Sequence, residues 1–213
     1  MPRERQDATP FVPEKGTIAD LRAAAQECRG CSLYRNATQA VFGEGPRKAS
    51  LLVVGEQPGD QEDRQGHPFV GPAGGLLDRA LEEAGIDRRQ VYVTNAVKHF
   101  KFEERGKRRI HKKPSMGEVA ACRPWLAAEV ARLKPHLILC LGATALASVV
   151  GTHVQLTRVR GQQLESVFEV PAMATRHPSS VLRASDSAGR AQAYAELLED
   201  LRRAARLLGT HKP

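Results

Sequence analysis

Short apolar runs recur along this 213-residue chain at intervals that suit a layered α/β domain. Each run is brief and is followed by glycine or polar residues, which is typical of strands buried on both faces of a sheet. The predicted strands cover residues 50–55 (SLLVVG), 91–95 (VYVTN), 136–142 (HLILCLG) and the run AMATRHPS at 172–179.

Stretches with helical spacing lie between these runs. The first begins at Thr17, whose hydroxyl suits an N-cap, and ends near Cys28. The others are predicted at 76–85, from Ser115 onward with Glu118 completing a capping box, at 143–150, and over the last twenty-odd residues. Alternating strands and helices predict a parallel sheet covered on both faces, with ligands bound beyond the carboxyl ends of the strands.

Composition narrows the class of protein. Residues 1–16 are polar, contain prolines and lack an apolar period, so we expect a mobile arm followed by one domain over 17–213. With 41% hydrophobic and 26% charged residues and no long apolar run, a collagen, a disordered chain and a membrane span are excluded. The N-terminus lacks the apolar stretch of a secretory signal, so we expect a cytoplasmic protein. The net charge of +8 indicates a polyanionic partner.

Four cysteines in a reducing compartment need a role other than disulfides. Cys28 and Cys31 form a C-x-x-C pair, which together with two distant ligands suits a metal or iron–sulfur site. Cys122 lies in a predicted helix, and Cys140 lies in an apolar strand where a thiol usually acts as a small hydrophobic group. His99 follows the second strand, and spacing alone does not choose between a ligand and a solvated histidine.

A Gly- and Pro-rich segment of some twenty residues follows the first strand. It places Glu56, Asp60, Glu62 and Asp63 at the mouth of the sheet, where carboxylates can stabilise a cationic transition state. The alternative is a solvated acidic helix start. A loop of this length in a compact domain is usually functional.

Two further segments carry candidate chemistry. Lys107, Arg108 and Arg109 suit phosphate contacts, although such a run can also be a solvated patch or an address signal. Positive neighbours favour the neutral, nucleophilic form of His111. His177 begins the sequence HPSS, which could donate a hydrogen bond to a developing anion or simply form a turn.

Taken together, GEQPG, PFVGPAGGLLD, VTNAVK and HPSSVLR resemble the motifs of the uracil-DNA glycosylase superfamily, in particular its iron–sulfur branch. The resemblance spans about residues 20–205. Gln57, the inserted KRRIH segment at 107–111, and His99 where that branch carries cysteine are similar to the X-type enzymes (UdgX), which become covalently trapped on DNA.

This resemblance implies a three-layer α/β/α fold with a central four-stranded parallel sheet. It implies an iron–sulfur cluster, expected to be 4Fe-4S, held by Cys28, Cys31, His99 and Cys122. It assigns the catalytic positions to His111, Glu56, Gln57, Asp60 and His177. Uracil would be bound by Phe69, Asn95, Ser179 and Arg183, and DNA by Lys107, Arg108 and Arg109.

The function implied is excision of uracil from DNA, preferably single-stranded, by a monomer that then becomes linked through His111 to the anomeric carbon of the sugar. Carboxylates would face the cationic sugar and hydrogen-bond donors the departing base. Three alternatives remain open at this point: a conventional glycosylase that turns over, a non-catalytic iron–sulfur protein that binds DNA, and a zinc protein.

Overall fold

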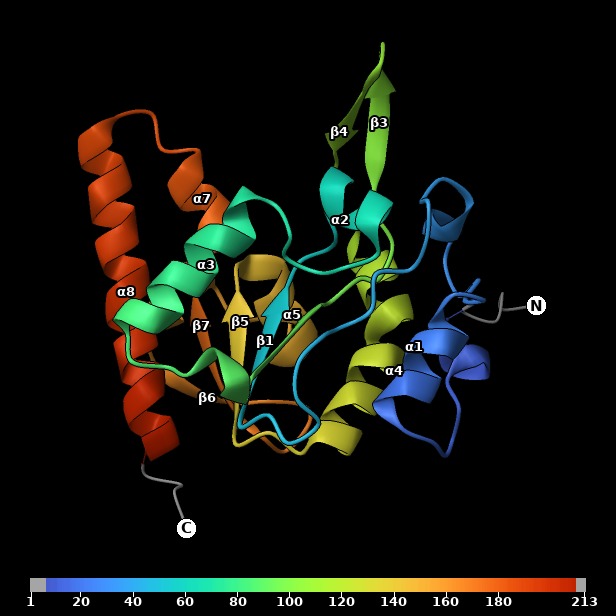
Figure 1. Ribbon diagram of the computed structural model, residues 1–213, viewed down its shortest axis with the longest axis horizontal. Coiled ribbons are helices and arrows are strands. Elements are labelled where there is room, and N and C mark those ends of the chain that lie inside the picture. Colours follow the sequence, from blue (N-terminus) through green and yellow to red (C-terminus); the bar gives the residue numbers. More distant parts are fainter. Residues whose placement is uncertain (1–6, 210–213) are drawn as a thin grey trace.

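The computed structural model describes residues 7–209 and contains a central sheet with the strand order β2-β1-β5-β7-β6 (Figure 1). The four parallel strands are β1 (Leu51–Gly55), β2 (Val91–Asn95), β5 (Leu137–Leu141) and β7 (Pro171–Thr175). They match the four predicted strands closely, because each is a continuous apolar run buried on both faces. The predicted parallel sheet is confirmed.

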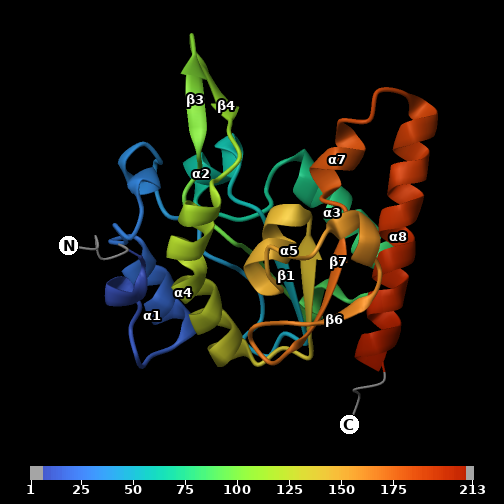
Figure 2. The same ribbon diagram turned by 180° about the vertical axis from the view of Figure 1, so that it is seen from behind.

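Helices cover both faces of the sheet (Figure 1 and Figure 2). One layer contains α1 (Ile18–Ala25), α4 (Met116–Leu133) and α5 (Ala143–Val149). The other contains α3 (Pro72–Glu83), α7 (Pro178–Leu182) and α8 (Ser187–Gly209). The capping boxes at Thr17 and Ser115 fix the starts of α1 and α4, as their sequences predict.

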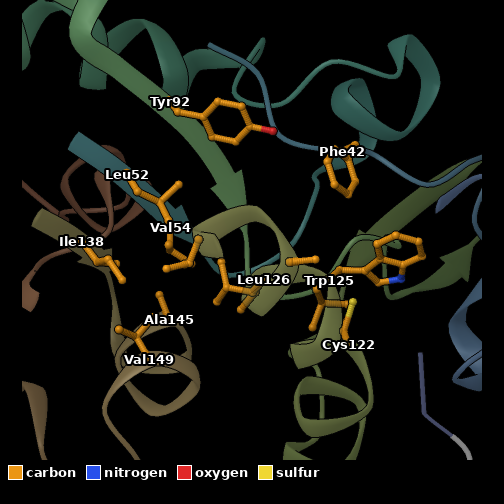
Figure 3. Packing of buried hydrophobic residues seen from close by; sticks show 14 of the residues in the cluster. Phe42, Leu52, Val54, Tyr92, Cys122, Trp125, Leu126, Ile138, Ala145 and Val149 are labelled. Atoms are coloured by element: carbon orange, nitrogen blue, oxygen red, sulfur yellow. The ribbon is translucent and has the colours of Figure 1, made fainter. Parts of the chain in front are cut away.

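Successive residues of a strand enter different cores. In β1, Leu52 and Val54 join the cluster under α1, α4 and α5, whereas Leu51 and Val53 join the cluster under α3 and α8. Figure 3 shows the first cluster, in which the Trp125 ring meets Phe42 edge to face with centroids 5.9 Å apart. Both cores together make the sheet a rigid base for the loops at its carboxyl edge.

The sheet has one strand more than the predicted four. β6 (Gln163–Glu165) pairs antiparallel with β7 at the edge of the sheet, after the short helix α6 (Leu156–Val159). Its three residues show no apolar run, and two of them are exposed. An edge strand this short is set by pairing with its neighbour rather than by its own hydrophobic pattern.

Two predicted irregular segments contain regular structure. The segment after β1 folds into α2 (Asp60–Gln65), and α3 begins four residues earlier than its predicted start. The basic segment after β2 forms a hairpin of β3 (Phe102–Arg105) and β4 (Arg108–His111) that projects from the domain above α2 (Figure 1). Gly106, with φ of 60°, supplies the positive φ that such a tight turn requires.

The N-terminal arm was expected to be free of the domain up to residue 16. Residues 1–6 lie outside the described residues, but Ala8 is buried and its N–H donates to the carbonyl oxygen of Ala121 in α4. Contact with the domain therefore begins well before the expected boundary.

Short 3-10 turns occur at Thr9–Phe11, Ser32–Arg35 and Arg88–Gln90. Within residues 7–209, no helix is both long and apolar enough to cross a bilayer.

Candidate active site

A cavity of about 270 Å³ opens where the carboxyl ends of β1, β2, β5 and β7 meet the base of the hairpin. This is the position expected for a ligand in an open parallel sheet. Most of the predicted catalytic and base-binding residues share its wall: Glu56, Gln57, Phe69, Asn95, His111, His177, Ser179 and Arg183. The structure therefore brings together residues that are up to 127 positions apart in the chain (183 − 56).

The Glu56 carboxylate faces the ring of His111 across the cavity mouth. Its Oε1 atom lies 3.4 Å from Nε2 of His111, and its Oε2 atom accepts a hydrogen bond from the Thr144 hydroxyl at the start of α5. Thr144 is buried, so this bond fixes the direction of the carboxylate. The arrangement places a negative charge beside a half-exposed imidazole.

Gln57 lies on the cavity wall, as predicted, and its amide also binds the hairpin. Its Nε2 group donates to the carbonyl oxygens of Lys101 and Lys112, each at 3.1 Å, and its Oε1 atom accepts from the Lys101 N–H. Lys101 and Lys112 are the residues at the two ends of the hairpin, and they also pair with each other. The buried Gln57 amide thus ties the hairpin, and with it His111, to the loop after β1.

Asp60 is not on the cavity wall, which corrects its expected place beside the sugar. Its carboxylate binds Arg64 and Arg109, and these arginines hold the pKa of Asp60 below its usual value although burial raises it. Arg109 also binds the fully buried Asp63 at 2.6 Å and lies over the ring of Phe102. Arg109 therefore fastens β4 to α2, and only 13% of its side chain is exposed.

The other two cations expected to bind DNA lie in the open. Lys107 and Arg108 are exposed at the turn of the hairpin, at the end furthest from the sheet (Figure 1). The three cations of the basic run therefore have different surroundings. Lys107 and Arg108 face solvent, whereas Arg109 binds side chains of α2.

The Phe69 ring forms one flat wall of the cavity. It lies parallel to the His177 ring within 20°, with centroids 6.4 Å apart. Phe69 has φ of 59°, an unfavourable value for an aromatic residue, and a Cβ on Gly74 would come within 1.7 Å of its carbonyl oxygen. Gly74 thus allows α3 to pack directly against this strained backbone.

Asn95 lies at the end of β2 with 3% of its surface exposed. A Cβ on Gly55 would lie 2.3 Å from its Oδ1 atom and 2.8 Å from the Phe69 ring, so Gly55 leaves room for both side chains. The Asn95 carbonyl oxygen accepts from Nζ of the buried Lys98, which is paired with Glu129 at 2.6 Å. Gly55, Lys98 and Glu129 were not among the predicted site residues, and the only signal for them in the sequence is the glycine that ends the first strand.

His177 is a neutral hydrogen-bond donor in this structure. Its Nδ1 atom accepts from the Ser179 N–H at 3.1 Å, so the ring proton resides on Nε2. Burial lowers the pKa of His177 to about 4, and the charges of Arg183 and His111 act in the same direction. A neutral N–H inside the cavity suits an acceptor that gains negative charge.

The cysteines form a second site, between α1 and α4. Burial raises the pKa of Cys31 and raises that of Cys122 to about 12, and for both thiols the nearby Cys28 acts in the same direction. Trp125 Nε1–H donates to Cys28 Sγ at 3.2 Å, and the Lys98 N–H donates to Cys122 Sγ at 3.3 Å. Such N–H···S bonds suit sulfur ligands that carry negative charge.

His99 directly follows Lys98, whose N–H contacts Cys122, and burial lowers the pKa of His99 to about 4, so its ring is neutral and able to ligate a metal. Cys140 lies alone in β5, within the hydrophobic core. No ready-made cluster of three or more His, Cys, Asp or Glu side chains at metal-binding geometry occurs among residues 7–209. The donor types and the N–H···S bonds fit an iron–sulfur centre, although the side chains do not already surround one.

Comparison with known families agrees with this geometry. The model of the uracil DNA glycosylase superfamily matches residues 42–202, which include the sheet and every predicted residue of the cavity. The chain belongs to the uracil DNA glycosylase superfamily. Type-4 uracil-DNA glycosylases are similar over most of their length: that of Thermotoga maritima is 40% identical over 74% of this chain and 79% of its own.

Two archaeal members of the superfamily extend the similarity. The type-4 uracil-DNA glycosylase of Pyrobaculum aerophilum is 36% identical over 78% of this chain and 85% of its own. That of Archaeoglobus fulgidus is 31% identical over 92% of this chain and 96% of its own. The relationship to the superfamily expected from the four motifs is therefore confirmed.

Proposed function

We propose that the protein excises uracil from DNA, the activity for which its type-4 relatives are named. The observation that carries this proposal is the joint placement of Phe69, Asn95 and His177 in one cavity. An extruded pyrimidine has a flat face for Phe69, an edge for the Asn95 amide, and an oxygen for the neutral His177 Nε2–H. That donor stabilises the negative charge that the base acquires as the bond from N1 to the sugar breaks.

The sugar side of the cavity suits the opposite charge. Loss of an anionic base leaves an oxocarbenium-like deoxyribose, and the Glu56 carboxylate is held near this position by Thr144. Ser179 and Arg183 line the same cavity and belong, with His177, to α7 and its two ends. The charges are thus divided between the two fragments of the substrate.

The proposal extends to capture of the sugar by His111. The unprotonated nitrogen of its neutral ring donates an electron pair to the anomeric carbon, forming a C–N bond as the C–N bond to uracil breaks. The resulting imidazolium is neutralised when the other ring nitrogen loses its proton to solvent, and Glu56 lies close enough to stabilise the charge meanwhile. The product is an N-glycoside with a poor leaving group, so the adduct persists. This behaviour is that of the X-type enzymes.

Single-stranded DNA is the preferred substrate in this proposal. A base that is already unpaired costs less to extrude into the cavity. Lys107 and Arg108 at the exposed tip of the hairpin supply positive charge for the phosphate backbone.

The proposal also includes an iron–sulfur cluster held by Cys28, Cys31, His99 and Cys122. Such a centre would join the turn after α1 to α4, and the Lys98 N–H that contacts Cys122 would donate to a ligand sulfur. Protein purified without oxygen should be brown with broad visible absorption. Colourless protein with bound zinc would contradict this part of the proposal.

One experiment tests the activity and the capture separately. The protein is mixed with uracil-containing single-stranded DNA, and free uracil is measured while a boiled sample is run on a denaturing gel. We expect uracil release and a protein band shifted by covalent DNA. His111→Ser should remove the shift and leave uracil release. Absence of uracil release by the unaltered protein overturns the proposed activity, and a shift that survives in His111→Ser overturns the assignment of the nucleophile.

A further inference from the structure

Glu62, one of the carboxylates of the segment after β1, reaches the cavity wall and forms no ion pair within residues 7–209. Its two oxygens bind different backbone segments. Oε2 accepts from the Gly59 N–H at 3.0 Å, and Oε1 accepts from the Gly71 N–H at 2.9 Å. Gly59 closes the GEQPG loop, and Gly71 closes the segment that contains Phe69. The carboxylate thus bridges the two loops that form opposite parts of the cavity.

Both amides are at helix starts, where backbone N–H groups have no partner within the helix. Gly59 precedes α2 and Gly71 precedes α3. Hydrogen bonds from an N–H to a carboxylate are stronger than those to a neutral oxygen. A single charge shared by two helix starts therefore holds them at a fixed separation.

The position of Gly71 matters because Phe69 is only two residues away. Phe69 keeps an unfavourable positive φ, so its backbone needs support from both sides. Gly74 supports it on the α3 side through close packing, and the bond from Gly71 to Glu62 ties the segment to the loop after β1. Releasing that bond leaves the strained turn free to relax and to turn the ring out of the stacking plane.

We infer that Glu62 is a positioning residue. By joining the segment that contains Phe69 to the GEQPG loop, it sets the width of the part of the cavity that receives the base, here called the base slot. This inference rests on the proposed function, since the occupant of the slot is the extruded uracil. Glu62 acts through backbone amides and transfers no proton. Its substitution should consequently weaken substrate capture more than it slows bond cleavage in the bound complex.

The test uses the full chain with Glu62→Gln, which keeps the size of the side chain. A glutamine has one acceptor oxygen and an NH2 group that cannot accept, so one of the two loops is released. Asp20→Asn is the matched control, because Asp20 also accepts a helix-start N–H, from Thr17 on α1, away from the cavity. Hydrogen exchange is measured for both variants, together with single-turnover uracil release over a range of DNA concentrations.

We expect Glu62→Gln to speed amide exchange in peptides covering 56–59 or 69–75 and to raise the half-saturating DNA concentration about tenfold, as one lost charge-assisted bond implies. The maximal rate should change less, and Asp20→Asn should change neither. Phe69→Leu alone should weaken capture, and adding Glu62→Gln to it should have little further effect, because both substitutions act on the same stacking contact.

The outcomes separate this inference from the proposed function. If the unaltered protein releases no uracil, the proposed function fails, while hydrogen exchange still reports whether Glu62 joins the loops. If exchange in Glu62→Gln is unchanged, or if it rises while half-saturation stays the same, the clamp is overturned. If Glu62→Gln raises the half-saturating DNA concentration equally in the unaltered protein and in Phe69→Leu, then Glu62 does not act through the Phe69 ring.

Discussion

Nε2 of His111 lies 3.4 Å from Oε1 of Glu56, and the other oxygen of the same carboxylate is bound by the Thr144 hydroxyl. The imidazole and the carboxylate beside it are therefore positioned by different elements, the hairpin and α5. Glu56→Gln removes the negative charge and keeps the shape. We expect it to slow both uracil release and adduct formation by about 100-fold, measured by single-turnover quench on uracil DNA. Thr144→Val should slow them less; unchanged rates in Glu56→Gln would contradict the assigned role.

Arg109→Ala should release the hairpin from α2. Asp63 would then be left buried with only the backbone N–H of Thr38 as a hydrogen-bond donor among its described contacts. We expect a loss of about 2–4 kcal/mol in the free energy of unfolding, measured by urea denaturation, and a clear loss of covalent adduct. Arg108→Ala removes an exposed cation of the same strand and serves as the control. Equal stability of the two variants would show that the anchoring role is wrong.

The buried pair of Lys98 and Glu129 lies next to Asn95, the residue proposed to bind the edge of the base. All three protons of the Lys98 ammonium are used, by Glu129, Thr94 and the Asn95 carbonyl oxygen. Lys98→Met leaves the buried Glu129 carboxylate without its cation and should lower the free energy of unfolding by about 3–5 kcal/mol. Combining it with Glu129→Gln should cost less than the sum of the single changes. Strict additivity in denaturant melts would disprove the coupling.

Cysteine substitutions test the proposed cluster. Cys122→Ser should remove the visible absorption and lower the melting temperature, because Cys122 is in the group of three thiols between α1 and α4. Cys140→Ala, in the core strand β5, should keep the colour and lose only a small amount of stability from the lost sulfur atom. Loss of colour in Cys140→Ala would mean that the ligand set is misassigned.

Acid should weaken the fold through His177. Burial holds the pKa of His177 at about 4, below the value near 6.5 of an unfolded chain. Between these pH values the unfolded chain binds a proton that the folded chain does not, so stability falls as pH falls from about 6.5 toward 4 and is unaffected above that range. The loss between pH 7 and 5 should be about 1–2 kcal/mol in urea melts. His177→Gln should reduce this slope without abolishing it, because burial also lowers the pKa of His99 to about 4. An unchanged slope would contradict the lowered pKa of His177.

The four parallel strands were predictable because each buries both faces and so has to be apolar throughout. Residues 51–55 and 137–141 have this character, and they lie within one residue of their predicted ranges. The hairpin and β6 could not be found by hydrophobic pattern, since their exposed strands carry charged or polar residues. The dipeptide Gly106-Lys107 was the available signal for the hairpin turn.

The sequence predicted which residues line the cavity better than it predicted what each of them contacts. Asn95 and His177 follow parallel strands, so the topology places them at one edge. Asp60 was expected to face the sugar, yet it lies off the cavity wall and binds Arg109 of the hairpin. Gln57 lies on the wall as expected, but its bonds to Lys101 and Lys112 were not predicted. A pairing between segments so far apart has no local signature, because it depends on how the hairpin folds back. Lys98 and Glu129 were missed for the same reason.

The backbone atoms of Lys101 and Lys112 bond to each other and share the amide of Gln57. The chain thus leaves the domain and returns to it at nearly the same point. A shortened variant that joins these positions by a tight turn would keep the floor of the pocket and lose the imidazole. The proposed capture of the sugar thus depends on a segment that can be removed, whereas Phe69, Asn95 and His177, the residues proposed to bind the base, lie outside it.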